Sequence, residues 1–195
     1  MEDAQQFGHP TESDHRDEMT TNTTSSQSAR SITMAQLPAL AGTSLGTSHR
    51  VLITQEQIAL FADATNDHQW IHVDPERAAT GPFGSTIAHG YLTLSLAVEL
   101  FFHLLDVTDC AQVINYGLDK VRFPAPVPVD SSVGAVADVT AVEPCPGGYQ
   151  LAVTLTFDAV GVDRPVCVAQ MILRYLGPVN STDSTSNELG GNGAR

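Results

Sequence analysis

The segment from Asp67 to Asp74 holds the residues of this chain whose types and spacing best suit acid–base chemistry. It reads Asp-His-Gln-Trp-Ile-His-Val-Asp, so the carboxylate of Asp67 and the imidazole of His72 are five residues apart. Two such groups on one loop can hold a water molecule, remove one of its protons and return a proton to a substrate. Taken alone, however, the two residues fit a capping aspartate and a surface histidine better than a catalytic pair.

The same segment also has the histidine spacing of a zinc-protease motif. His68 and His72 are four residues apart, but Gln69 stands where that motif needs a glutamate base. The flanking Asn66 and Pro75 deny the long helix that would align both histidines on one metal ion. We therefore expect no metal here, and we expect the His68 side chain to point into solvent.

The neighbouring residues predict how this segment is held. Thr54 and Gln57 have the spacing of a capping box, so a helix is expected to begin after Thr54. It should end near Thr65–Asn66, because asparagine tolerates the left-handed backbone that terminates helices. Asp67–His72 is then a loop or a short helical turn. Asp74 is expected to cap a further turn that begins at Pro75.

Two types of element follow this loop. From about Thr86 to Leu105 apolar residues fall on every side of a helical wheel, which predicts a helix buried all round. Five strand-like runs come next, separated by turns rich in proline and glycine. They are residues 113–116, 118–123, 133–142, 150–159 and 166–176. One helix followed by an antiparallel meander predicts an α+β fold in which the sheet curls around the helix. Pro124, Pro126 and Pro128 predict an edge or a crossover between strands.

The two ends of the chain differ from this middle part in composition. Residues 1–44 are polar and rich in serine and threonine, so we expect a disordered leader. We expect the folded domain to span residues 45–177 and a loose tail to span residues 178–195.

The overall charge bears on the partners. With 22 acidic and 9 basic side chains, the net charge is −13, so we expect no nucleic-acid partner. The polar amino terminus resembles no signal peptide, and polar residues interrupt the apolar run from Ile87 to Leu105 too often for a membrane span. A cytoplasmic protein is expected.

Three separated motifs resemble one family, the MaoC-like (R)-specific enoyl-CoA hydratases, also called hydratase 2. Ala64-Thr65-Asn66-Asp67 with His72 resembles the hydratase-2 motif, and Ile87-Ala88-His89-Gly90 resembles the start of the family's central helix. Val121–Val127 resembles its Phe-x-x-Pro-Val strand. The likeness spans residues 45–176 and is closest to the nodulation-protein-N-like subgroup. It implies a single hot dog domain that acts as a homodimer and hydrates trans-2-enoyl-CoA to (R)-3-hydroxyacyl-CoA.

The resemblance also implies roles for individual residues. Asp67 and His72 would be the catalytic pair, although which of them is the formal base stays open. Gly90 would give its backbone N–H to the thioester oxygen, where one preorganised donor is worth roughly 3–4 kcal/mol. A plain packing role for Gly90 stays open. We expect His89 to be a structural histidine with satisfied hydrogen bonds.

Candidate substrate contacts are less specific. Lys120 and Arg122, with Arg77 as a third candidate, would bind the phosphates of coenzyme A, although solvated charges fit nearly as well. Trp70, Phe83 and Tyr91 would contact the acyl chain, although each could equally be core. Coenzyme A is part of the substrate, and no separate cofactor is expected.

Three other functions stay open. The first is a 3-hydroxyacyl-thioester dehydratase acting on acyl carrier protein, which runs the same chemistry backwards. The second is a non-catalytic hot dog subunit that binds acyl thioesters. The third is a thioesterase, which has no need of the Asp67–His72 motif.

Overall fold

The computed structural model describes residues 29–178, and the remaining parts of the expected leader and tail lie outside this range. The helical elements are η1 (Met34–Leu40, a 3-10 helix), α1 (Gln55–Thr65), α2 (Trp70–Val73), α3 (Pro75–Ala79), α4 (Gly90–Ser95) and α5 (Ala97–Phe102). The strands are β1 (Arg30–Ile32), β2 (Thr43–Thr47), β3 (Val51–Leu52), β4 (Leu105–Val107), β5 (Gln112–Arg122), β6 (Ser132–Cys145), β7 (Gly148–Ala159) and β8 (Cys167–Leu176).

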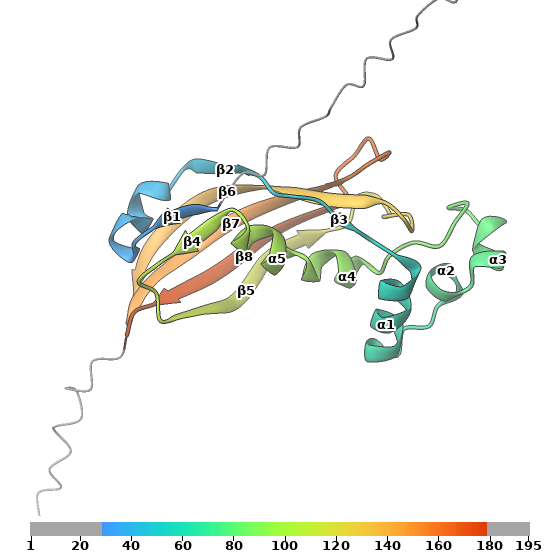
Figure 1. Cartoon of the computed structure of the whole chain (residues 1–195), viewed down its shortest axis with the longest axis horizontal. Helices are drawn as coiled ribbons and strands as arrows, with labels where there is room; N and C mark the ends of the chain where they lie inside the picture. Colours follow the sequence, from blue (N-terminus) through green and yellow to red (C-terminus); the bar gives the residue numbers. More distant parts are fainter. Residues whose placement is uncertain (1–28, 179–195) are drawn as a thin grey trace, which may run out of the picture.

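One antiparallel sheet dominates the fold. Its strands run in the order β2-β6-β7-β8-β5, and β3 pairs with β6 beside β2. Buried and partly exposed residues alternate along β7 and β8, as expected for strands with one face on a core. The sheet curves around α4 and α5, while α1, α2 and α3 lie together beyond one end of it (Figure 1). The predicted α+β class and the meander are therefore confirmed.

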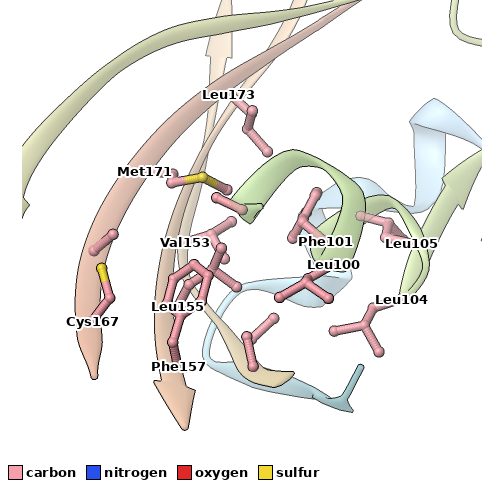
Figure 2. Packing of buried hydrophobic residues seen from close by; sticks show 14 of the residues in the cluster. Leu100, Phe101, Leu104, Leu105, Val153, Leu155, Phe157, Cys167, Met171 and Leu173 are labelled. Carbon is pink, nitrogen blue, oxygen red and sulfur yellow. The ribbon is translucent and has the colours of Figure 1, made fainter. Parts of the chain in front are cut away.

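The core lies between α5 and the concave face of the sheet. Figure 2 shows Leu100 and Phe101 facing Val153 and Leu155 of β7, with Leu173 of β8 nearby. Leu100, Phe101 and Leu155 are completely buried. Burying a leucine or phenylalanine side chain contributes roughly 1.5–3 kcal/mol, so these contacts hold the helix against the sheet.

The central helix is shorter than the sequence predicts, and the expectation of burial all round is wrong within one chain. It begins at Gly90, breaks at Leu96 and ends at Phe102. Tyr91 is 72% exposed, and Val98 and Phe102 are each 38% exposed. Within the described part of a single chain, nothing covers this side of the helix. Its apolar residues are therefore left exposed. No helix within residues 29–178 has the length and hydropathy needed to cross a membrane.

The start of the helix is delayed by backbone pairing. The Ala88 N–H donates to the Val127 carbonyl at 2.8 Å, and the Ile87 N–H donates to the Ile71 carbonyl at 3.0 Å. These bonds keep the residues before Gly90 extended. They also attach the segment with Pro124, Pro126 and Pro128 to helix α2, which carries His72.

The expected disordered leader is wrong for residues 30–44. This stretch forms β1, η1 and the start of β2, and β1 pairs in parallel with β4. Leu37 and Leu40 of η1 are completely buried in the core. Few bulky apolar residues stand in this polar segment, but Ile32, Leu37 and Leu40 are all buried in the core.

Candidate active site

Helix α1 delivers the Asp67 loop as the sequence predicts. The Thr54 side chain accepts from the Gln57 N–H, and the Gln57 side chain accepts from the Thr54 N–H, so both bonds of the capping box form. Asn66 ends the helix in the left-handed conformation, with φ of 58°. This turn places Asp67 directly after the helix end, where its side chain is only partly exposed.

His72 lies on the short helix α2 and is 6% exposed. Its Nδ1 is 2.7 Å from the carbonyl oxygen of Ile87. A carbonyl can only accept, so we assign the proton to Nδ1, which leaves a lone pair on Nε2.

The predicted role of Asp74 is confirmed. Its side chain caps the following helix α3 by accepting from the Arg77 N–H at 3.0 Å.

The environment of His72 favours the neutral ring. Burial lowers the pKa of His72 below the usual histidine value of 6.5, because the charged ring is poorly solvated. The bond to the Ile87 carbonyl and the nearby Asp67 carboxylate oppose this shift, because each raises the pKa of His72. The net shift is downward, so Nε2 is available as a base near neutral pH.

Asp67, His72 and His89 converge. Each offers one polar side-chain atom, and these atoms all lie within 4.8 Å of one another. The rings of His72 and His89 stack with centroids 3.8 Å apart and an interplanar angle of 23°. The sequence suggests the first pair, but it does not suggest that His89 joins them.

Three donors at this spacing raise the question of a metal ion. A metal lies close to the plane of every imidazole that binds it, and two stacked rings cannot both have the same ion in their planes. The stacked rings of His72 and His89 are therefore unsuited to bind the same metal ion. His68 is half exposed and lies 2.9 Å from Asp63, so it points away from His72 as expected.

A cavity of about 300 Å³ opens beside this cluster. His72 and Gly90 both line it, together with Phe83, Thr93 and Phe123. Gly90 is the first residue of α4, and the first N–H groups of a helix have no acceptor within the helix. A carbonyl oxygen placed in this cavity could therefore be close to the Gly90 N–H and to the His72 ring together.

The three predicted acyl-chain residues occupy different surroundings. Phe83 lines the cavity. Tyr91 does not, but its ring makes an edge contact with Phe123, which does. Trp70 lies outside the cavity, where Arg77 stacks 4.4 Å from the ring centroid of Trp70.

Lys120 and Arg122 lie on the outer face of the sheet. In the register of β5 with β8, Lys120 pairs with Gln170 and Arg122 with Val168, whereas the alternate residue Met171 is buried on the helix side. Paired residues of neighbouring strands point to the same face. Neither basic side chain lines the Gly90 cavity in a single chain, so their role with coenzyme A stays a prediction.

Sequence reasoning did not assign Phe123 or Thr93 to the site, although both line the cavity. Phe123 packs over Gly90, where an added Cβ would lie 3.2 Å from the ring. Thr93 is buried one turn into α4. Phe123 belongs to the Val121–Val127 motif, so its position beside the prolines was a usable signal. Thr93 had no such signal, because a threonine on an apolar helix can serve many purposes other than lining a site.

Comparison with known proteins agrees with this architecture. Residues 36–160 match the model of the MaoC like domain. A protein of Mycobacterium tuberculosis named 3-hydroxyacyl-thioester dehydratase Z is 54% identical over 144 residues, which cover 73% of this chain and 95% of that protein. Nodulation protein N of Rhizobium leguminosarum bv. viciae is 49% identical over 104 residues, covering 52% of this chain and 65% of its own.

A solved structure is also similar. The (R)-hydratase from A. caviae involved in PHA biosynthesis superposes with a TM-score of 0.57 and 25% identity, covering 67% of this chain and 95% of its own. Together with the curled sheet and its helix, this likeness identifies a single hot dog domain. The chain belongs to the MaoC-like dehydratase family.

Proposed function

We propose that this protein is a hydro-lyase that adds water to trans-2-enoyl-CoA to give (R)-3-hydroxyacyl-CoA. The observation that carries the proposal is the convergence of the Asp67 and His72 side chains beside a cavity lined by Gly90. Family membership and the names of the relatives support the same class of reaction.

The chemistry needs three functions at one place. A water molecule must attack C3, a proton must reach C2, and negative charge must be stabilised on the thioester oxygen. Asp67 and Nε2 of His72 hold the water and exchange its proton, which typically contributes about 10²–10⁴-fold in rate. The N–H of Gly90 binds the oxygen as charge develops on it.

A second candidate is the reverse reaction on a carrier protein. It is favoured by the relative named 3-hydroxyacyl-thioester dehydratase Z, which matches this chain over 95% of that relative's length. The same residues would then remove water from a 3-hydroxyacyl thioester. The two candidates differ in the direction that dominates and in the group that carries the acyl chain.

The decisive assay follows loss of the conjugated thioester absorbance with crotonyl-CoA. Asp67→Asn and His72→Gln should each abolish turnover while circular dichroism and melting temperature stay close to those of the wild type. His68→Gln is the matched control, because His68 is an exposed neighbour of the same residue type. Near-normal turnover in both site variants would overturn the assignment of Asp67 and His72 as the catalytic pair, whereas no turnover by the wild type would favour a non-catalytic acyl-thioester-binding subunit.

Two further measurements separate the alternatives. Comparing kcat/KM for the CoA thioester with that for the same acyl group on acyl carrier protein distinguishes the hydratase from the dehydratase. Release of free thiol from acyl-CoA would instead indicate a thioesterase.

We also propose a homodimer formed through β5 and the exposed side of α4 and α5. Within the described residues, β5 is the end strand of the sheet, so one of its edges has no neighbour. Leu118 of β5 is exposed, as are Val98 and Phe102 of α5. Leu118 and Val98 line one shared cavity, so the strand edge and the helix face form a continuous apolar surface. A second copy could cover it by antiparallel pairing of the two β5 strands.

A further inference from the structure

We infer that His89 is a positioning residue that holds both members of the catalytic pair. The inference rests on the proposed function of Asp67 and His72, and it assigns His89 two separate tasks. One is a hydrogen bond to the backbone of Asp67, and the other is a ring contact with His72.

The first task concerns the loop that carries the carboxylate. The Nε2 atom of His89 lies 2.9 Å from the carbonyl oxygen of Asp67. This carbonyl belongs to the first residue after the αL turn at Asn66, where α1 no longer restrains the chain. The His89 N–H therefore ties the Asp67 backbone to the residue that precedes Gly90, although 22 residues separate Asp67 and His89 in sequence.

The second task concerns the ring of His72. His89 lies against His72 on one side, with ring centroids 3.8 Å apart, and also contacts Phe61, with centroids 5.0 Å apart. The bond from Nδ1 to Ile87 holds one edge of the His72 ring but makes no contact with the faces of the ring. The ring of His89 covers one face of the His72 ring. The Phe61 ring, on α1, contacts His89 in turn and helps to hold it in place.

The protonation state of His89 follows from its bonds. His89 is 3% exposed, and its Nδ1 is buried with no hydrogen-bond partner among residues 29–178. Because Nε2 must donate to the Asp67 carbonyl, the neutral ring carries its proton there and has a bare lone pair on Nδ1. A proton on Nδ1 would be a buried donor without an acceptor, which is costly. His89 is thus a neutral donor rather than a proton carrier, and the expectation of full hydrogen-bond satisfaction is wrong for Nδ1.

One residue therefore connects three parts of the site. It bonds the Asp67 loop, backs the His72 ring and directly precedes Gly90 in the chain. Errors of about 1 Å in the placement of reacting groups can cost about 10²-fold in rate. Loss of His89 should accordingly lower kcat much more than it raises KM.

The first test reads the tautomers directly in the full-length wild-type protein. Nitrogen-15 NMR of the histidine rings should find His89 protonated on Nε2 and His72 on Nδ1, both neutral at pH 7. The His68→Gln, His72→Gln and His89→Gln variants assign the signals. A His89 ring that is charged, or that carries its only proton on Nδ1, overturns the inference.

The second test separates the two tasks with a pair of variants. His89→Phe keeps a ring beside His72 but has no donor, whereas His89→Gln keeps a donor but has no ring. We expect kcat to fall about 10²-fold in His89→Phe with little change in KM. The kcat of His89→Gln, which keeps a donor, should be about tenfold higher than that of His89→Phe. Such a factor is the scale of one hydrogen bond. If both variants had the same kcat as the wild type, a positioning role for His89 would be contradicted.

Failure of the proposed function would look different. If the wild type turns over no enoyl or 3-hydroxyacyl thioester, the assignment of the reaction is wrong. The role of His89 is then decided by the tautomers and by the carbonyl carbon-13 signal of Asp67, which should shift in His89→Phe and stay near its wild-type position in His89→Gln. An Asp67 signal that moves equally in both variants counts against the bond.

Discussion

The Nδ1 atom of His72 donates a hydrogen bond of 2.7 Å to the carbonyl oxygen of Ile87. Ile87 itself is held by its own N–H, which donates to Ile71 at 3.0 Å. The two bonds join the His72 helix to the segment that leads into Gly90. The first bond also decides that Nε2, and not Nδ1, is the nitrogen of His72 that can act as a base.

The activity should depend on the neutral form of His72. Burial lowers its pKa below 6.5, so the acid limb of kcat/KM should have its midpoint below pH 6.5. A pH series of initial rates with crotonyl-CoA measures this limb. An acid limb centred above pH 6.5 would contradict the assignment of His72 as the titrating base.

The same shift predicts a pH dependence of stability. Between the lowered folded pKa and 6.5 the unfolded chain binds more protons at His72 than the folded chain does. The contribution of neutral His72 to the free energy of unfolding should therefore be fully present well above pH 6.5. It should decrease as the pH falls below 6.5. Urea unfolding of the wild type and His72→Gln at several pH values isolates this contribution, because the variant lacks the titrating ring. Parallel curves for the two proteins would show that His72 is not the source.

Gly90→Ala tests the cavity beside the helix start. The added Cβ would lie 3.2 Å from the Phe123 ring, which is exposed enough to move by a few tenths of an ångström. We expect a change in stability below about 1 kcal/mol, because alanine also favours a helix more than glycine does. We expect kcat to fall at least tenfold, because the methyl group and the displaced ring narrow the space beside the N–H. Phe123→Ala combined with Gly90→Ala is the control, since it removes the crowding and leaves only the effect of the methyl group.

The amino-terminal segment should contribute to folding. Leu37 is completely buried, so Leu37→Ala is expected to cost about 2–5 kcal/mol in urea unfolding. Leu60→Ala makes the same chemical change at a site on α1 that is 62% exposed, and should change stability by less than about 0.5 kcal/mol. Equal effects of the two substitutions would mean that residues 34–40 do not dock on the core in solution.

The proposed dimer can be tested at its centre. Leu118 of β5 is 47% exposed in a single chain. Leu118→Glu would place a charge within the apolar surface shared by two copies, so sedimentation should find a monomer where the wild type is a dimer. Leu60→Glu, on a distant exposed surface, should remain dimeric. A monomeric wild type would exclude this assembly.

Much of the local structure could be predicted from the sequence. The capping box of Thr54 and Gln57 and the left-handed Asn66 depend on contacts within a few residues, and both form as expected. The strands β7 and β8 follow from alternation along the chain, which a half-buried sheet requires. The Asp67–His72 spacing and the two later motifs were sufficient to indicate the family.

The rest depended on contacts between distant residues. The helix begins at Gly90 because Ala88 pairs with Val127, and no local pattern contains that bond. The outward direction of Lys120 depends on the register of β5 with β8, which includes bulges that shift the faces. His89 joins Asp67 and His72 only because α1, α2 and α4 meet at one end of the sheet. Side-chain convergence of this kind is a property of packing in three dimensions, so only the tertiary structure could decide it.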